Sequence, residues 1–267
     1  MGSMRYPLSE NFLRYFDVEF AASPEQLAQV FAIRYRVYCE EFSYEPAEAF
    51  PDRQESDEFD ADSLHALVWH KSSGLAAGCV RLVATTGDSG ADPLPFEKNC
   101  AGSLDQEYID SLSLQRQKVC EISRLAVDGA FRRRSGEQDT RYGEVEGLDL
   151  SQQERRTFSL IAVTCFLAAT ALTEISDRTN VFAMMEPFLP RLLQRSGIDF
   201  RRVGQDIDYH GMRAPYFVTT QSALEGMRPD LKELYTEVYH RIHAGYRGQE
   251  AAGLGASPAS PEFDGKQ

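Results

Sequence analysis

The chain has 267 residues and a formal net charge of -13 at pH 7. Hydrophobic residues make up 42% and aromatic residues 11%, which is enough for a sizeable core and excludes global disorder. The acidic balance argues against nucleic acid or an anionic membrane surface as the main partner, because both attract basic surfaces.

Cysteine usage and the N-terminus indicate a cytoplasmic protein. Five widely spaced cysteines without a CxxC pair favour buried, reduced thiols over a disulfide framework or a thiolate zinc site. Met1-Gly2-Ser3-Met4 has no apolar run after it, so we expect no secretory signal and interpret these residues as a cloning remnant. The longest apolar stretch, residues 158–172, is shorter than the roughly 20 residues that span a bilayer. It predicts a buried helix, either plain core or the lining of an acyl tunnel.

The first predicted element is a helix. Ser23-Pro24-Glu25 is a helix-start signal, and apolar positions continue with helical spacing to Tyr38. Residues 40–62 are acidic and turn-rich, which predicts a loop. Two apolar runs, 64–69 and 75–84, are separated by a polar turn and predict an antiparallel hairpin.

The second half alternates strands and helices. Residues 119–127 predict a strand and residues 131–150 a polar loop, after which Ser151 and Glu154 are typical of a capping box. We expect that helix to run to about residue 175. The remaining predictions are a strand at 180–185, a helix at 188–196, closing strands at 200–203 and 214–219, and an amphipathic helix at 229–246.

These elements predict an α/β (α+β) fold with one mixed central sheet flanked by helices. We expect residues 1–22 to be an N-terminal segment, residues 23–246 a single domain, and residues 247–267 a disordered tail.

Several ionisable residues occupy positions where the pattern calls for apolar ones. Buried charges are costly unless they are paired, so we expect three arginines and three carboxylates to neutralise one another in one cluster. The cluster either forms a functional site or only holds the acidic loop in place. Its members are Arg34, Arg81, Arg124, Asp57, Asp60 and Glu121.

Glu121 and Arg124 lie three residues apart in the strand at 119–127. Strict alternation places them on opposite faces of a sheet. Both can serve one site only if a bulge near Ser123 changes the direction of the chain. Cys120 alternates away from Glu121, which favours a small buried residue over a nucleophile.

Four short elements follow one another along the first half of the chain. They are Arg34-Tyr35-Arg36-Val37-Tyr38, Asp57-Glu58-Phe59-Asp60, Cys79-Val80-Arg81-Leu82 and Glu121-Ile122-Ser123-Arg124-Leu125-Ala126-Val127. In order and approximate spacing they resemble elements of the acyl-homoserine-lactone synthases, and the resemblance covers residues 26–127. That family is a branch of the GNAT fold that moves an acyl chain from acyl carrier protein to an amino group.

The second half resembles a narrower group, the acyltransferases associated with PEP-CTERM/exosortase systems, which are relatives of N-acyl amino acid synthases. The residues that carry this resemblance are Phe131-Arg132-Arg133-Arg134, Arg191-Leu192-Leu193-Gln194-Arg195-Ser196-Gly197 and Asp208-Tyr209-His210-Gly211-Met212-Arg213-Ala214-Pro215-Tyr216. The tryptophan that the synthases carry after the first helix has no counterpart, because the sole tryptophan is Trp69. That departure argues against S-adenosylmethionine as the acceptor.

The resemblance implies a GNAT-like acyl-CoA N-acyltransferase fold and an acyl-phosphopantetheine thioester as donor, either acyl carrier protein or acyl-coenzyme A. No tightly bound cofactor is implied. Aminolysis of a thioester needs a base and donors for the developing oxyanion, and Glu121 is the candidate base, acting directly or through water. Ser123 and Arg124 complete the predicted catalytic group, and His210 is a predicted substrate contact.

A second predicted set binds the donor. The resemblance implies that the backbone of the strand after the bulge holds the thioester, and the arginines that follow suit phosphopantetheine or an acidic carrier protein. The residues are Leu125, Ala126, Val127, Arg132, Arg133, Arg134 and Gly136. The five histidines do not form a metal set.

The sequence therefore favours transfer of a fatty-acyl group to the amino group of an amino acid or similar small metabolite. Two alternatives stay open: an ordinary acetyl-coenzyme A N-acetyltransferase, and a non-catalytic sensor of acyl carrier protein or acyl lipids. We expect no nucleic-acid partner and no membrane span.

Overall fold

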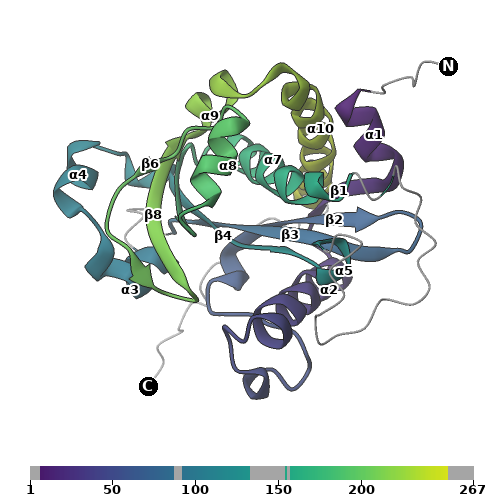
Figure 1. The fold of residues 1–267 in the computed structure, drawn as a ribbon, viewed down its shortest axis with the longest axis horizontal. Helices are drawn as coiled ribbons and strands as arrows, with labels where there is room; N and C mark the ends of the chain where they lie inside the picture. Colours follow the sequence, from purple (N-terminus) through teal and green to yellow (C-terminus); the bar gives the residue numbers. More distant parts are fainter. Residues whose placement is uncertain (1–6, 87–91, 133–153, 155–156, 252–267) are drawn as a thin grey trace, which may run out of the picture.

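A single eight-stranded sheet organises the computed structural model, which describes residues 7–86, 92–132, 154 and 157–251 (Figure 1). The strand order is β1-β2-β3-β4-β5-β8-β6, with β7 paired to β8 off this path. β4 and β5 are parallel and every other pair is antiparallel. The strands are β1 (Phe16–Ala21), β2 (Ser63–His70), β3 (Leu75–Ala84), β4 (Val119–Val127), β5 (Asn180–Met185), β6 (Arg201–Arg202), β7 (Ile207–Asp208) and β8 (Met212–Thr219).

Helices cover both faces of the sheet. Figure 1 shows α1 (Leu8–Tyr15), α7 (Ser159–Ile175), α8 (Leu189–Arg195), α9 (Thr220–Gly226) and α10 (Pro229–Ala251) on one side. The other side carries α2 (Pro24–Arg34), which continues directly as a π-helix, η1 (Tyr35–Glu41). Shorter helices are α3 (Pro95–Cys100), α4 (Gln106–Ser111) and α5 (Gly129–Arg132), with 3-10 turns η2 (Ala47–Ala49), η3 (Asp60–Asp62), η4 (Ala101–Ser103) and η5 (Arg116–Lys118).

The helix α7 lies very close to β3 at Gly78. A Cβ atom at this position would lie 2.9 Å from Cγ2 of Ile161 and 3.0 Å from Sγ of Cys165. Only glycine therefore allows the apolar helix to approach the sheet this closely. Most of the predicted apolar stretch is plain core, since α7 packs its buried residues against β2, β3 and β4.

Most predicted elements are confirmed. The hairpin is β2 paired with β3, and the strands near residues 119, 180 and 214 are β4, β5 and β8. The first helix begins with a complete capping box, because Ser23 Oγ accepts a hydrogen bond from Gln26 N and Gln26 Oε1 accepts one from Ser23 N. This helix ends at Arg34, and the residues up to Tyr38 that were predicted to extend it belong to η1.

Two predicted boundaries are wrong. The domain does not begin at residue 23, because β1 pairs along its whole length with β2, and Phe12 and Phe16 lie in the core. At the other end α10 runs to Ala251, five residues beyond the predicted end of the domain. The remaining tail lies outside the described residues.

The predicted capping box pairs Glu154 with Ser151, and it cannot be compared with the structure at Ser151. The helix α7 begins at Ser159, and Ser151 lies outside the described residues. The carboxylate of Glu154 contacts a buried histidine, with 2.7 Å between Glu154 Oε1 and His70 Nε2.

The strand β4 is bulged where the sequence requires it. Cys79 pairs with Ala126 and Arg81 pairs with Ser123, so two residues of β4 oppose one residue of β3. One of the two is Arg124, which has a φ of +50°. This left-handed conformation strains any residue other than glycine. A bulge also changes the direction in which the side chain of the bulged residue points. The predicted bulge near Ser123 is confirmed.

Every helix in the described part of the chain falls short of the length and apolarity needed to cross a membrane.

Candidate active site

A buried arginine at the end of α2 forms the base of the site. Arg34 is fully buried, with its Nε 2.5 Å from Oε2 of Glu55 and its Nη1 2.6 Å from Oδ1 of Asp60. A further hydrogen bond of 3.0 Å joins Nη2 of Arg34 to Oδ2 of Asp60. The guanidinium thus binds two carboxylates, one of them through two bonds, which is the geometry that offsets the cost of burying charge.

The strand β3 adds a second buried cation. Nη1 of Arg81 lies 2.6 Å from Oδ1 of Asp57 and 2.8 Å from Oδ1 of Asp60. Its Nε donates to Oγ of Ser123 at 3.2 Å. Arg81 therefore connects the acidic loop to the bulged region of β4.

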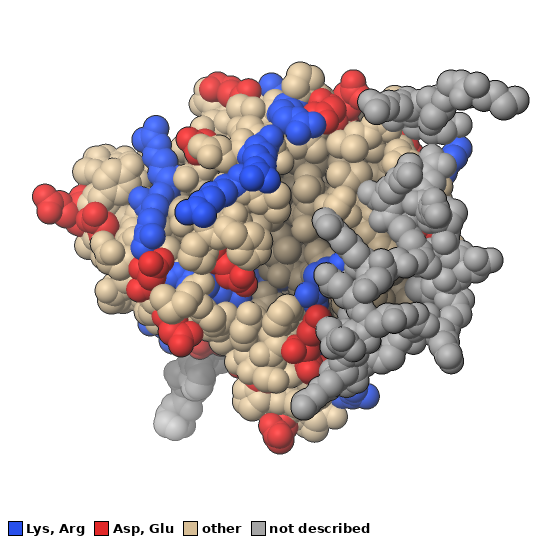
Figure 2. Space-filling view, viewed as in Figure 1, with Lys and Arg blue, Asp and Glu red and all other residues tan. Residues whose placement is uncertain are grey.

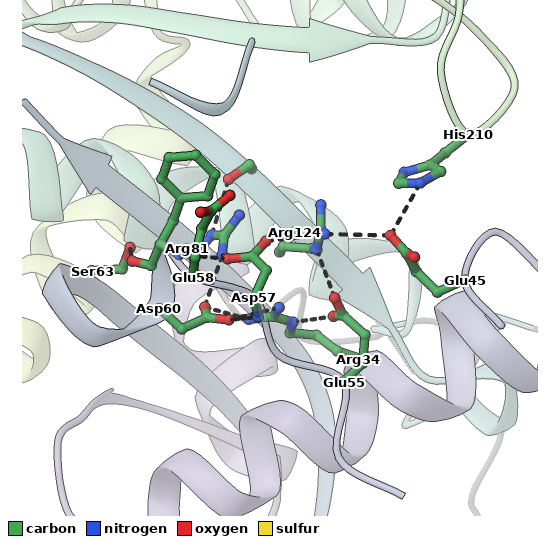
Figure 3. Close-up of polar contacts among 12 residues, drawn as sticks. Arg34, Glu45, Glu55, Asp57, Glu58, Asp60, Ser63, Arg81, Arg124 and His210 are labelled. Atoms are coloured by element: carbon green, nitrogen blue, oxygen red, sulfur yellow. Dashed lines mark hydrogen bonds and ion pairs between the residues drawn. The ribbon is translucent and has the colours of Figure 1, made fainter. Parts of the chain in front are cut away.

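The bulge brings the third arginine to the same face of the sheet. Nε of Arg124 lies 3.2 Å from Oε1 of Glu55, and its Nη2 lies 3.1 Å from Oδ2 of Asp57. Nη2 also lies 3.6 Å from Oε1 of Glu45 (Figure 3). The residues predicted to share a cluster thus do so with one exception: Glu121 lies outside the ion-pair network, which instead includes Glu55 and Glu45.

The network sets the charge states of its members. Burial by itself raises the pKa of Asp60, but the hydrogen bond and charge of Arg34, with the charge of Arg81, hold that pKa below its ordinary value. His65 lies beside the network and is buried, and burial lowers its pKa to about 4, with the charge of Asp60 opposing the shift. His65 is therefore neutral at pH 7.

Glu121 lies on the same face of β4 but has a different partner. The residue is 3% exposed, and its Oε2 accepts a hydrogen bond of 2.8 Å from the backbone N–H of Phe96 in α3. Burial raises the pKa of Glu121 to about 7, although the Phe96 N–H and the charges of Arg81 and Arg124 oppose the shift. A carboxyl group that titrates near neutral pH is suited to general base catalysis.

The loop between β7 and β8 forms another wall of the site. Nε2 of His210 lies 3.1 Å from Oε1 of Glu45, which in turn contacts Arg124. Burial lowers the pKa of His210 to about 4, and the charges of Arg124 and Arg213 lower it further. The predicted histidine therefore lies within the site and is neutral at pH 7.

A narrow, mostly apolar pocket lies on the opposite face of the sheet. Within the described residues, β4 and β5 pair only at Val119–Asn180, Cys120–Val181 and Glu121–Phe182. Beyond these pairs Ile122 lines the pocket together with residues of β5, β8 and the helices above the sheet. The other lining residues are Phe166, Ala169, Thr170, Thr173, Val181, Ala183, Ile198, Phe200, Val218, Thr220 and Ala223.

The predicted donor-binding residues divide into three groups. Leu125, Ala126 and Val127 lie on β4 just after the bulge, and the carbonyl of Leu125 accepts a hydrogen bond of 3.2 Å from the Tyr38 hydroxyl. Arg132 lies on α5, where its Nε donates to the carbonyl of Val127 at 2.7 Å and its Nη2 pairs with Glu41. Arg133, Arg134 and Gly136 lie outside the described residues.

The sequence did not predict five polar or aromatic residues of the site, which are Tyr44, Glu45, Glu55, Tyr209 and Arg213. Glu45 and Glu55 lie in an acidic loop where no periodic pattern distinguishes one carboxylate from another. Tyr209 and Arg213 belong to the segment around His210, so the segment as a whole was the available signal. No group of three or more His, Cys, Asp or Glu residues suited to a metal ion occurs among the described residues.

Comparison with known proteins gives one family match. Residues 33–140 match the acetyltransferase (GNAT) domain family. No curated protein matches the chain.

Several solved structures share the fold. TofI, in a ternary complex with an inhibitor and MTA, is 20% identical with a TM-score of 0.55, over 81% of this chain and 99% of that chain. MesI, a CoA-dependent acyl-homoserine lactone synthase, is 16% identical with a TM-score of 0.54, over 84% of this chain and 95% of that chain.

FeeM, an N-acyl amino acid synthase from uncultured soil microbes, is 11% identical with a TM-score of 0.51, over 82% of this chain and 97% of that chain. At these identities the likeness shows the fold. The predicted GNAT-like fold, with a mixed sheet flanked by helices, is confirmed.

Proposed function

We propose that the chain, whose residues 33–140 match the acetyltransferase (GNAT) domain family, is an acyltransferase that moves a fatty-acyl group from a phosphopantetheine thioester to the amino group of an amino acid or a similar small metabolite. The observation that carries this proposal is the position of Glu121. This buried carboxyl group, with a pKa of about 7, lies at the last residue where β4 and β5 pair. A base is thus held beside the point where the two strands separate.

The proposed reaction is aminolysis of the thioester. The amine nitrogen attacks the carbonyl carbon, Glu121 takes the amine proton directly or through water, and a C–N bond replaces the C–S bond. Glu121 then returns the proton to the departing thiolate. Residues 122–127 of β4 have no strand partner on the β5 side among the described residues, so backbone N–H groups on that edge are available to the developing oxyanion.

The apolar pocket supports a long acyl chain in place of an acetyl group. Its walls include Ile122 of β4, which is adjacent in the chain to Glu121. Ala169 and Ala183 are small side chains that leave room between α7 and the sheet. An acyl chain bound here buries apolar surface, at about 25 cal/mol per Å² of that surface.

A basic and apolar surface on α8 supports acyl carrier protein as the donor. Phe188, at the start of α8, and Leu192 are 60% and 46% exposed, and the same helix carries the exposed Arg191 and Arg195. Figure 2 shows basic side chains gathered over α8 and β6, where Arg201 is also exposed. On a chain with net charge -13, such a local patch suits a small acidic partner.

The acetyl-coenzyme A alternative is favoured by the description of the matched domain family. A donor panel separates the two functions. We expect release of free thiol from dodecanoyl-acyl carrier protein or dodecanoyl-coenzyme A in the presence of amino acids, and little release from acetyl-coenzyme A. Faster turnover of the acetyl donor would favour the alternative.

Glu121→Gln tests the proposed base. The variant keeps an oxygen that accepts from the Phe96 N–H, so the fold should persist while thiol release falls by about 100-fold or more. Glu48→Gln, in an exposed position, is the matched control. Unchanged turnover in Glu121→Gln would remove this residue from the mechanism. The resemblance of the second half to PEP-CTERM-associated acyltransferases stays a prediction.

A further inference from the structure

The imidazole of His210 is held rigidly from three directions. Its ring stacks on Tyr209 at a centroid distance of 4.5 Å and on Tyr44 at 5.7 Å. Its Nε2 lies 3.1 Å from Oε1 of Glu45 (Figure 3). The backbone is also unusual, since His210 has a φ of +53° and Gly211 a φ of +88°. Strained backbone of this kind persists where the surrounding structure holds it, and it is concentrated at functional sites.

One nitrogen of this ring is not used by the protein. Nδ1 of His210 is buried and has no hydrogen-bond partner among the described residues. Because the Glu45 carboxylate, 3.1 Å from Nε2, can only accept, it favours the neutral ring with its proton on Nε2, which leaves a lone pair at Nδ1. A buried acceptor without a partner is costly, and a ligand N–H group placed here removes that cost.

Arg213, beside the same tyrosine, also has a hydrogen-bond donor that no described residue uses. The guanidinium of Arg213 lies over the ring of Tyr44, at 5.6 Å from its centroid. Nε of Arg213 is buried without a hydrogen-bond partner, and no carboxylate among the described residues forms an ion pair with this arginine. Arg213 therefore offers an N–H donor and a positive charge, and it contacts Tyr44, as His210 does.

Tyr209 connects His210 with the surroundings of the proposed base. The Arg124 guanidinium interacts with the Tyr209 hydroxyl and with Glu45. Burial raises the pKa of Tyr209, Arg124 opposes the shift, and the charge of Glu121 adds to it. Tyr209, which stacks on His210, thus feels the charges of both Arg124 and Glu121.

A lone-pair acceptor beside a guanidinium matches a ligand that carries an N–H donor next to an anionic group. We propose that His210 and Arg213 bind the acceptor substrate and select an α-amino acid over a simple amine. Nδ1 of His210 accepts a hydrogen bond from the amino group, and the guanidinium of Arg213 donates to the carboxylate. This inference rests on the proposed function, of which it names the acceptor subsite and its chemical class.

Binding of free amino acids tests the subsite without turnover. The probes are the common amino acids, each paired with the amine that lacks its carboxylate, titrated calorimetrically into the full-length protein saturated with coenzyme A. We expect at least one amino acid to bind about tenfold or more tightly than its decarboxylated partner, and Arg213→Gln to abolish that preference. Equal binding of the two partners, or no binding of any amino acid, would overturn the subsite.

A pair of substitutions at His210 separates recognition from loop structure. His210→Gln places a polar group near the Nε2 position and removes the acceptor at Nδ1, whereas His210→Asn keeps a polar oxygen near Nδ1. We expect His210→Gln to weaken amino-acid binding about tenfold and His210→Asn to retain most of it. Equal loss in both variants, or no loss in His210→Gln, would contradict direct recognition. His240→Gln on α10 is the matched control.

Calorimetry and a thiol-release assay on the same protein together distinguish this inference from the proposed function. If an amino acid binds with the expected dependence on His210 and Arg213 but no thioester is consumed, the subsite stands and the acyltransferase proposal fails. If a thioester is consumed with simple amines as readily as with amino acids, the acyltransferase proposal stands and the subsite fails.

Discussion

Arg124 and Glu55 form an ion pair that joins the bulge of β4 to the acidic loop, with 3.2 Å between Nε and Oε1. Glu55 is 1% exposed and also binds Arg34 at 2.5 Å. One carboxylate therefore lies between two guanidinium groups that are remote in sequence. The position of Arg124 in the site depends on this carboxylate as much as on the bulge.

Loss of that carboxylate should destabilise the protein strongly. Glu55→Gln leaves two buried guanidinium groups with one anionic partner fewer, which should cost about 3–5 kcal/mol in the free energy of unfolding. Urea denaturation followed by circular dichroism measures the change. Glu48→Gln is the exposed control, and a loss below 1 kcal/mol in Glu55→Gln would show that the pair contributes little.

The left-handed backbone at Arg124 predicts an order of stability between two small substitutions. Glycine adopts a φ of +50° without strain, whereas alanine does not, so Arg124→Gly should be more stable than Arg124→Ala by about 1 kcal/mol. Both variants lose the same guanidinium. Thermal denaturation of the two proteins side by side measures the difference, and an alanine variant at least as stable as the glycine variant would argue against the bulge.

The pKa of Glu121 predicts how activity depends on pH. Because burial raises that pKa to about 7, the base is protonated and inactive below this pH, and kcat/KM should rise through pH 7 to a plateau. The residual activity of Glu121→Gln should lack this rise. A wild-type profile that is flat between pH 5.5 and 8.5 would contradict the assignment.

The same group predicts a difference in stability. A folded-state pKa raised above the ordinary value of about 4.3 means that the folded protein holds this proton more tightly than the unfolded chain. The contribution of Glu121 is most favourable below that ordinary value and is lost as the pH rises to about 7. The stability of wild type relative to Glu121→Gln should therefore fall between pH 5 and pH 8, which urea denaturation at each pH measures.

The close approach of α7 to β3 predicts a packing defect. Gly78→Ala places a methyl group within 3 Å of the Ile161 side chain, so the helix must shift, at a cost of about 1–3 kcal/mol. Gly102→Ala is the matched control, because no atom lies within 4 Å of the added Cβ there. Equal stability of the two variants would show that α7 adjusts freely.

Filling the apolar pocket should change the choice of donor. Ala169→Leu projects three further carbons into the pocket and should shift the preferred acyl chain to a shorter length. Ala244→Leu, at an exposed position on α10, is the control. Competition between acyl donors of different length, read by mass spectrometry of the products, measures the shift. An unchanged preference would place the acyl chain elsewhere.

The parts of the site that the sequence predicted are those carried by regular elements. Apolar patterns are interrupted by three arginines, Arg34, Arg81 and Arg124. These interruptions predicted an ion-pair cluster and a bulge, and the structure contains both. The partner of Glu121 was not predictable in this way, since Phe96 donates from a short helix between residues 84 and 119, where no element was predicted.

The missed features depend on contacts between distant segments. Glu55 differs from its neighbours only in being 1% exposed, which follows from how the loop folds over α2. The strand β1 does show alternation in Phe16-Asp17-Val18-Glu19-Phe20, and its inclusion in the sheet follows from pairing with β2, roughly fifty residues away. That alternation was a usable signal and was overlooked.

The central claim is that Glu121 acts as the general base in the transfer of a fatty-acyl group to an amine. Its most direct test is mass spectrometry of lipid extracts from cells that express either the wild-type chain or Glu121→Gln at matched protein levels. We predict N-acyl amino acids in the wild-type extract that are absent, or reduced by about 100-fold, in the variant extract. Equal amounts of N-acyl product in the two extracts, or none in the wild-type extract, would contradict the claim.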